Sequence, residues 1–372
     1  FNLSTIVLAC SSLKEYIKTA METQNVNYDI ILIDRSFHIE PAKMKREIQN
    51  TLSKLPTNID TVLVAMGFCG GTWDNVTFPF RIVIPRVDGS ANCGNISSAV
   101  GPFAIDEGLV QAIEPITVVR VLNTNTNKII EEHVRVKDGK AMVHGDEVIQ
   151  GVPGTGSRID MYFEDPAGSK TGKLFPTGKK KEIFDVPDFG EIEVTVLDCS
   201  NPMVFIRAKD LGIQGTELVE LNQNQSVMEH IERIRCIAAW KCGFVEHWED
   251  ARTKSTSAPK VSIISAPHNY MDMDKHTVQA ESMDICCRAI SVGALHKAYP
   301  MTVAVGTGAA ARIPGTIVNE IVNPKPDQEI IRIGHASGVT EVDIKMNGEK
   351  VLKGGVTRTA RRIMDGWVYV RD

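Results

Sequence analysis

Residues 1 to about 88 alternate strand-like and helix-like segments, and this alternation restricts the fold more than any other feature. Four apolar runs predict strands: STIVLAC (Ser4 to Cys10), YDIILID, DTVLVAMG and FRIVIPRV. Helical spacing of apolar residues fills SLKEYIKTAMET and the stretch from Pro41 to Leu55. Strands connected through helices run parallel, because each crossover returns the chain to the same end of the sheet. The sequence therefore predicts an α/β parallel-sheet segment over residues 1–88.

The pattern changes after about Gly89, where short apolar runs are joined by Asn, Gly and Pro turns. Hairpin turns are expected at Thr124 to Asn127 and at Asp138-Gly139. Four helices are expected, one beginning near Ser97 and the others over about Val227 to Cys242, Met283 to Ala298 and Ala309 to Glu320. The stretch Asp165 to Glu182 is rich in Gly, Lys and Thr and predicts an exposed loop. Strands dominate between these elements, so the sequence predicts an α+β fold.

The amino-acid composition argues against several kinds of binding partner. The 41 Lys and Arg against 46 Asp and Glu give a net charge of −5 without a basic stripe, which argues against nucleic acid. No apolar run approaches the roughly 18 residues of a membrane span, and the start of the chain does not resemble a secretory signal. Eight cysteines in 372 residues are too few for a disulfide scaffold. We expect a cytoplasmic protein with free thiols, no membrane partner and a small-molecule substrate, and we leave a homo-oligomer open.

Three side chains that suit a soft metal lie at predicted strand ends. Cys10 ends the first strand, while His38 and Cys69 follow the second and third. The carboxyl ends of parallel strands meet at one edge of a sheet, where ligands bind, and thiolate and imidazole suit an ion such as zinc. This placement allows a metal- or corrinoid-binding module. Two buried cysteines and a hydrogen-bonded histidine explain the same residues equally well.

Cys93 lies in a glycine-rich turn, NCGN, directly before a predicted helix. A thiol at a helix N-terminus is favoured as thiolate, and the free N–H groups there attract a carboxylate. The pattern predicts a proton-abstracting base beside an anion site, although a capped helix with an incidental cysteine would look the same. A similar glycine-rich turn is expected at Gly306 to Gly308, leading into the last predicted helix. Its alternative is a tight connection that packs Ala309 to Ala311 in the core.

A series of motifs after Asp88 resembles the PrpF family. They are NCGNISSAVGPFAIDE, NTNTNKII, GDEVIQGVPGTG, LFPTGKKKEIFDV, CSNPMVFIRAKDLGIQGTE, GTGAAARIPGTIVNEIV, RIGHASGV and TRTARRIMDGWVYV. The resemblance implies a diaminopimelate epimerase-like fold of two halves, here residues 89–184 and 185–372. It also implies an isomerase that moves a double bond in a small unsaturated di- or tricarboxylate of the methylitaconate kind, without a cofactor and without a metal.

The resemblance assigns roles to particular residues. Cys93 falls on the family's catalytic cysteine. The implied substrate contacts are Asn92, Gly94, Asn95, Asn201, Thr307, Gly308 and Ala309, and His335 and Arg312 are further candidates for the anion site. The epimerases of this fold carry a second cysteine in the later turn, where this chain has Ala310, which excludes a symmetric two-thiol mechanism.

Residues 1–88 do not fit this family. Their segments CSSLKEYI, DRSFHIEP and VAMGFCGGTWDN resemble instead an uncharacterised microbial domain family of unknown function. The lysine that the PrpF family pairs with its cysteine lies upstream in the family, and no lysine before Cys93 can be assigned that role. Loss of the early strands of the first half predicts an unpaired sheet edge and exposed apolar surface. The alternatives to an active isomerase are therefore the metal- or corrinoid-binding module and a non-functional chimera.

Overall fold

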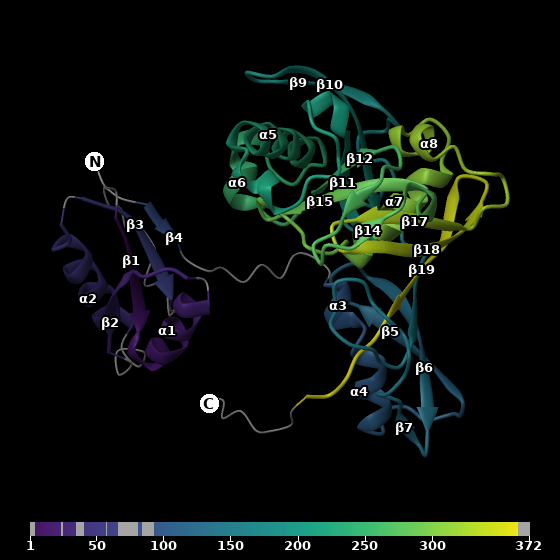
Figure 1. The fold of residues 1–372 in the computed structure, drawn as a ribbon, viewed down its shortest axis with the longest axis horizontal. Coiled ribbons are helices and arrows are strands. Elements are labelled where there is room, and N and C mark those ends of the chain that lie inside the picture. The colour runs from purple at the N-terminus through teal and green to yellow at the C-terminus, as the bar shows by residue number, and fades with distance from the viewer. Residues whose placement is uncertain are drawn as a thin grey trace. The chain divides into compact units, whose positions relative to one another are not determined.

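The structure is a computed structural model that describes residues 4–23, 25–34, 41–56, 58–65, 81–83 and 93–363 (Figure 1). The chain divides into two compact units, Phe1–Asp88 and Gly89–Asp372. None of the helices in the described ranges combines the length and the apolar character needed to cross a membrane.

The first unit contains the predicted parallel sheet. Its strands lie in the order β2 (Asp29–Ile33), β1 (Ser4–Cys10), β3 (Ile59–Ala65) and β4 (Arg81–Val83), and every pair is parallel. The helices are α1 (Lys14–Thr23), which follows a short 3-10 turn, and α2 (Pro41–Ser53). One face of α2 is apolar and packs against the sheet. Its residues Met44, Ile48 and Leu52 are buried in one cluster with side chains of β1, β2 and β3. The α/β prediction for this segment is confirmed.

The second unit is built on one long mixed sheet. In spatial order the described strands are β5 (Ile116–Asn123), β6 (Lys128–Lys137), β8 (Ile159–Glu164), β19 (Lys350–Arg358), β18 (Gly338–Asn347), β17 (Ile330–His335), β15 (Ile285–Ser291), β12 (Lys260–Ser265), β11 (Asn201–Arg207), β10 (Gly190–Cys199) and β9 (Glu182–Val186), with β7 (Lys140–Ala141) beside β6 and β16 (Ala294–Leu295) beside β15. A separate hairpin joins β13 (Tyr270–Met271) and β14 (Thr277–Val278). Strands and helices share this unit, which confirms the α+β prediction.

Two helices cover opposite faces of this sheet. The strands β10, β11 and β12 are apolar at successive positions, so alternate side chains enter different cores. Phe205 and Ile264 pack with α7 (Met301–Arg312), whereas Val204 and Ile263 belong to the cluster of α5 (Gln225–Lys241). The helix expected over Val227 to Cys242 is therefore confirmed as α5, and Asn224 caps it by accepting a hydrogen bond from the backbone N–H of Val227.

A smaller lobe carries the cysteine motif. It contains α3 (Gly94–Ser97) and α4 (Val100–Asp106), which pack beside β5, β6 and β7. The hairpin turns predicted at 124–127 and 138–139 connect β5 to β6 and β6 to β7. The C-terminal strand β19 passes from β18 into this lobe, where it pairs with β8 (Figure 1). The last strand of the chain thus joins the lobe to the larger sheet.

Two sequence predictions about this unit are wrong. The segment expected as a helix over Met283 to Ala298 forms β15 and β16, because its short apolar run ICCRAIS pairs with β12 and is buried on both faces. The helix expected over Ala309 to Glu320 is divided between the end of α7 and α8 (Ile317–Val322). Pro314 and Gly315 separate the two, since proline cannot continue a helix and Gly315 has φ +90°.

The predicted loop before β9 is irregular but only partly exposed. Asp198 of β10 is fully buried and holds this loop through four hydrogen bonds. Its carboxylate accepts from the Ser169 hydroxyl at 2.5 Å, the Lys170 N–H at 2.8 Å, and the Thr171 N–H and hydroxyl at 2.7 and 2.8 Å. The division between halves that the sequence places at residue 184 falls inside β9, and the division into halves stays a prediction.

We expect Asp198→Ala to lower the free energy of unfolding by about 3 kcal/mol, because it leaves buried donors of the loop without an acceptor. Urea unfolding followed by circular dichroism measures this change. Asp146→Ala, at an exposed position, is the control and should stay within about 0.5 kcal/mol of the parent chain. Equal stability of the two variants would show that the Asp198 bonds contribute little.

Glu132 of β6 is a buried acid beneath α4. The side chain is 0% exposed, its Oε2 accepts a 2.9 Å hydrogen bond from the Gly101 N–H, and its Oε1 has no partner among the described residues. Burial raises the pKa of Glu132 from 4.5 to about 7, although the Gly101 hydrogen bond opposes the shift. The native protein therefore holds this proton up to near-neutral pH.

This raised pKa makes stability depend on pH. Between pH 4.5 and about 7 the unfolded chain releases the Glu132 proton while the native chain keeps it, so the free energy of unfolding falls as pH rises. The expected loss is about 3 kcal/mol across this window, with no further loss above it. Glu132→Gln, which has no charge to bury, should remove that part of the slope in urea titrations at pH 4.5 and 8. Glu191→Gln, at an exposed position of β10, should leave the slope as it is.

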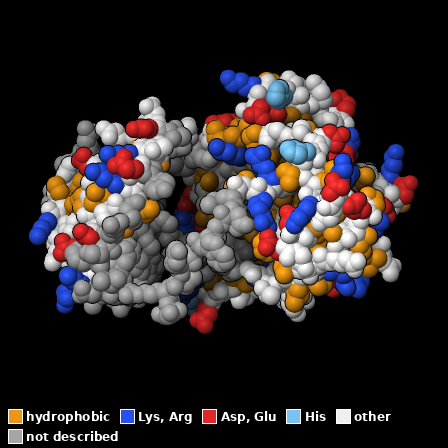
Figure 2. Space-filling view, turned by 90° about the horizontal axis from the view of Figure 1, so that it is seen from below, with side chains coloured by type: hydrophobic (Ala, Val, Ile, Leu, Met, Phe, Trp, Pro, Cys, Tyr) orange, Lys and Arg blue, Asp and Glu red, His pale blue; other side chains and the backbone are white. Residues whose placement is uncertain are grey.

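The lobe of α3 and α4 exposes apolar side chains, as the sequence predicted. The exposed large apolar residues there are Ile96, Val100, Phe103, Leu109, Ile113, Ile116, Val118 and Leu122. Strand β5, which carries the last three, ends the sheet and pairs only with β6 in the described chain. Elsewhere, basic and acidic side chains are interspersed with hydrophobic ones over the visible face (Figure 2).

Candidate active site

Cys93 is the N-cap residue of α3, closer to the helix than the sequence predicted. Its backbone is extended (φ −97°, ψ 97°), its side chain is exposed and makes no capping hydrogen bond, and its carbonyl accepts from the Ser97 N–H and hydroxyl. A turn at residues 98–99 then leads into α4. The thiol is accessible and is not used in capping the helix.

Gly94 brings the start of α3 against the start of α7. A side-chain carbon added at Gly94 would lie 2.7 Å from Met301 Cε, so glycine is what permits this approach. Met301 is the first residue of α7, after the N-cap residue Pro300. Two helix starts from distant parts of the sequence therefore meet. Asn95 is exposed on α3, and Asn92 lies outside the described residues.

The second half of the predicted site is wrong in position. The sequence places a turn at Gly306 to Gly308, but these residues lie in the middle of α7, which begins at Met301. Thr307, Gly308 and Ala309 are buried within the helix, where backbone N–H groups bond to carbonyls one turn earlier. They cannot donate to a substrate. Met301 and Thr302 take the place that the sequence gives to residues 307–309.

The glycines of α7 serve packing against the sheet. A side-chain carbon at Gly308 would lie 2.7 Å from both Val342 Cγ1 and Ile344 Cγ1 of β18, and one at Gly306 would overlap Met203 of β11. Larger residues at these positions would push the helix away from the strands. A glycine pair in a sequence can thus mark close helix–sheet contact as well as a turn.

Asn201 lies at the start of α7, as the family resemblance implied it would lie near the site. It begins β11, is 1% exposed, and its Nδ2 donates to Thr302 Oγ1 at 3.4 Å. The neighbouring Ser200 hydroxyl donates to the Thr302 carbonyl at 2.7 Å. These bonds fix the first turn of α7 to the start of β11.

Lys260 is the basic group that the sequence analysis missed. It begins β12, directly beside β11, where it is the register partner of Met203. Burial lowers the pKa of Lys260, and the nearby Cys93 opposes the shift by raising it. Its ammonium has no hydrogen bond or ion pair to any residue in the described ranges. Lys260 is thus an amine with a lowered pKa that interacts electrostatically with the accessible thiol of Cys93.

His296 lies within electrostatic reach of Lys260. Burial lowers the pKa of His296, the hydrogen bond to the Ala298 carbonyl at 2.6 Å raises it, and Lys260 lowers it further. Because a carbonyl oxygen only accepts, Nδ1 carries the proton, and Nε2 of the neutral ring is an acceptor. Cys93 thus acts electrostatically on Lys260, and Lys260 acts on His296, although the three residues are distant in sequence.

The two further anion-site candidates are His335 and Arg312. His335 is buried, which lowers its pKa to about 3 and keeps the ring neutral. Arg312 is the last residue of α7, about 16 Å along the helix from Met301 at 1.5 Å per residue. Its Nη2 donates to the Pro326 carbonyl at 2.8 Å. Arg312 thus lies at the opposite end of α7 from Met301, and its role at the anion site stays a prediction.

The metal hypothesis for the first unit concerns residues that are mostly not described. Cys10 is buried at the end of β1, as predicted, whereas His38 and Cys69 lie outside the described residues. Among the residues that the structure describes, no group of three or more His, Cys, Asp or Glu side chains is arranged to hold a metal ion.

Comparison with known proteins gives two family matches. Residues 74–371 match the model described as PrpF protein. Residues 32–101 match a protein of unknown function, DUF1638, so the two matches overlap around the boundary between the units.

The chain aligns with about three quarters of the length of its curated relatives. The chain is 43% identical to 3-methylitaconate isomerase of Eubacterium barkeri over 76% of this chain and 75% of that protein. It is 36% identical to 2-methyl-aconitate isomerase of Shewanella oneidensis (77% and 75%) and 31% identical to 4-oxalomesaconate tautomerase of Pseudomonas putida (77% and 73%). The crystal structure of methylitaconate-delta-isomerase matches with a TM-score of 0.70 and 42% identity, over 77% of this chain and 74% of that one. The epimerase-like α+β fold expected from the resemblance is confirmed.

Proposed function

The chain belongs to the PrpF protein family and is an isomerase of small unsaturated carboxylates, and on this premise we propose that it moves a double bond in a methylitaconate-like dicarboxylate by proton transfer at Cys93. In this reaction a C–H bond breaks at the carbon between a carboxylate and the double bond. The pair of electrons spreads over the allyl system, and a proton is added at the former methylene carbon, which becomes a methyl group. Atoms and charge balance without any co-reactant.

The observation that supports this proposal is the meeting of Cys93 with the start of α7 and with Lys260. The allylic anion is stabilised when its carboxylate receives hydrogen bonds from donors fixed beforehand. The first turn of α7 has unpaired N–H groups, and Asn201 and Ser200 hold that turn in place. Gly94, the residue after Cys93, packs against Met301 in this same turn.

Lys260 supplies a second proton-transfer group. An allylic shift needs one group that removes a proton and a group that returns one, and a single thiol must otherwise move between two carbons. The sequence offers no lysine before Cys93 for this purpose, whereas the fold brings Lys260 from β12 into electrostatic contact with the thiol. We assign Cys93 and Lys260 to the two ends of the allyl system.

Isomerisation in deuterated water tests the proposed function. The full chain incubated with 3-methylitaconate should produce dimethylmaleate that carries deuterium in the new methyl group, measured by proton NMR and mass spectrometry. 2-Methylaconitate and oxalomesaconate, tested in parallel, should react more slowly. A chain that neither shifts the double bond nor exchanges deuterium with any of the three acids would contradict the proposal.

A further inference from the structure

Arg358, at the end of β19, is a partly buried cation without an anionic partner among the residues that the structure describes. Its Nη1 donates to the neighbouring Thr357 carbonyl at 2.8 Å, and its guanidinium forms no ion pair with a carboxylate of the described chain. Burial alone lowers its pKa to about 10. Buried charges in folded proteins are normally paired, because an unpaired one loses its hydration without compensation. The guanidinium is therefore available to an anion.

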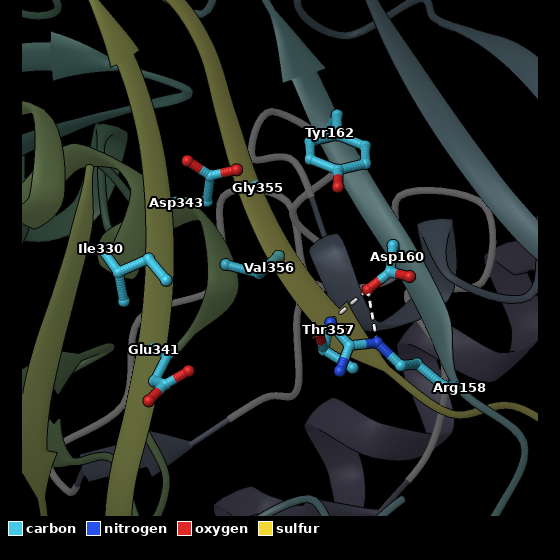
Figure 3. A pocket seen from close by; sticks show the side chains of 9 residues that line it. All are labelled: Arg158, Asp160, Tyr162, Ile330, Glu341, Asp343, Gly355, Val356 and Thr357. Atoms are coloured by element: carbon cyan, nitrogen blue, oxygen red, sulfur yellow. Dashed lines mark hydrogen bonds and ion pairs between the residues drawn. The ribbon is translucent and has the colours of Figure 1, made fainter.

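Strand alternation places Arg358 on the face of the sheet that α7 covers. Val356, two residues earlier, belongs to the core around α7, and the register partners of these two positions on β8, Ile159 and Met161, belong to it as well. Thr357 occupies the opposite face, where its hydroxyl donates to Asp160. Both residues line a cavity of about 160 Å³, which shares Arg158, Glu341 and Thr357 with the cavity beside Arg358 (Figure 3). Arg358 thus extends from the end of the inner face.

A cavity of about 360 Å³ adjoins Arg358. Its lining includes Gln150, Arg158, Thr340, Glu341 and Arg358. Arg158 is already neutralised, since it bonds Asp160 at 2.7 Å and lies 3.6 Å from Glu147. Arg358 is the cation of this cavity that has no carboxylate among the described residues. The volume is sufficient for a small carboxylic acid.

The neighbouring His335 bonds the hydroxyl oxygen of Thr340, so that this hydroxyl becomes a second hydrogen-bond donor in the cavity. Its Nδ1 accepts from the Ser337 N–H at 3.2 Å, so the proton of the neutral ring is on Nε2. Nε2 then donates to Thr340 Oγ1 at 2.9 Å, which leaves the hydroxyl hydrogen of Thr340 free to donate elsewhere. Thr340 lines the same cavity as Arg358, so a planar guanidinium and a hydroxyl both offer hydrogens to it.

His335, which bonds Thr340 of this cavity, also contacts Tyr299 near the start of α7. The ring of His335 stacks on Tyr299 with centroids 6.2 Å apart, and Tyr299 directly precedes Pro300, the N-cap residue of α7. Arg358 and His296 both act electrostatically on His335. Through the ring of His335, the surroundings of Arg358 therefore reach the residues directly before α7.

We propose that Arg358, with the Thr340 hydroxyl, binds the substrate carboxylate that is remote from the reacting carbon. This assignment rests on the proposed function and adds the anchor that it lacks. A guanidinium pairs with a planar carboxylate through two parallel hydrogen bonds, which explains why an arginine is kept unpaired here. The expected ligand class is a small dicarboxylate or tricarboxylate.

Calorimetric titration with 2,3-dimethylsuccinate tests the proposal without chemistry, because this saturated acid cannot isomerise. Arg358→Gln in the full chain should bind it at least tenfold more weakly than the parent, and Arg358→Lys should recover part of the loss. Arg158→Gln, which removes a paired arginine of the same cavity, should bind within about twofold of the parent. Inorganic phosphate should bind more weakly than the dicarboxylate.

Three results would overturn the assignment. They are parent-like binding by Arg358→Gln, equal losses in Arg358→Gln and Arg158→Gln, and phosphate binding as tight as the dicarboxylate. Thermal unfolding establishes that each variant is folded, and if Arg358→Gln is not, then Arg358→Lys and Thr340→Val decide by the same criterion. A chain that binds the saturated acid through Arg358 but moves no double bond would overturn the proposed function alone. If the parent chain isomerises the substrate but Arg358→Gln binds the saturated acid as tightly as the parent does, only the assignment of Arg358 is overturned.

Discussion

Cys93→Ser should lose deuterium incorporation and double-bond movement by roughly 10²- to 10⁴-fold, the range typical of removing a positioned acid–base group. A serine hydroxyl fits the same N-cap position but gives up a proton far less readily than a thiol. The side chain is exposed and makes no capping hydrogen bond, so the fold should tolerate the change. Single-turnover isomerisation of 3-methylitaconate in deuterated water measures the loss.

Cys242→Ser provides the matched control for this variant. Cys242 is a free, partly buried thiol at the C-cap of α5, on the other side of the sheet from α7. Its substitution should leave the isomerisation rate within about twofold of the parent. If Cys93→Ser and Cys242→Ser isomerise the substrate equally fast, Cys93 is not the proton-transfer group.

Lys260→Gln should lower kcat by roughly 10²-fold or more while KM changes little, because glutamine keeps the polarity of the site but carries no proton. The parent pH profile should contain an alkaline-side ionisation below the ordinary lysine value of 10.5, since burial lowers the pKa of Lys260. That ionisation should disappear from the profile of the variant. Isomerisation rates measured from pH 5 to 10 give both results.

A second substitution separates proton transfer from simple charge. Lys260→Arg keeps a cation that cannot lose its proton, so it should remain as slow as Lys260→Gln if the amine transfers a proton. If Lys260→Arg recovers the rate, Lys260 acts through its positive charge and does not transfer a proton. Lys254→Gln, which removes an exposed lysine paired with Asp250, should retain the parent rate and profile.

The first unit could be predicted from sequence in detail because its structure depends on local patterns. Apolar runs of strand length and helical stripes alternate there along the chain. The two hairpin turns and α5 were predictable for the same reason. The segment from Ile285 to Ser291 was not, because a short apolar run fits a strand and a buried helix equally well and only its pairing with β12 decides between them.

The residues of the candidate site also differ in whether a local sequence pattern reveals them. The sequence alone singled out Cys93, because a cysteine between glycine and asparagine before a helix is a local pattern, and the family motifs identified the reaction class. The position of the opposing helix start could not be read locally. Gly306 and Gly308 look like a turn until the strands that pack against them are known.

Sequence by itself determined the classes of fold and reaction and pointed to Cys93, since these depend on residues that are neighbours along the chain. Only the tertiary structure suggested the distant groups that we propose to act with that thiol. Lys260 is separated from Cys93 by several strands, Thr302 is fixed by Asn201 from another strand, and Arg358 comes from the last strand of the sheet. Their chemistry depends on burial and on which partners are absent, and neither property is encoded by spacing along the sequence.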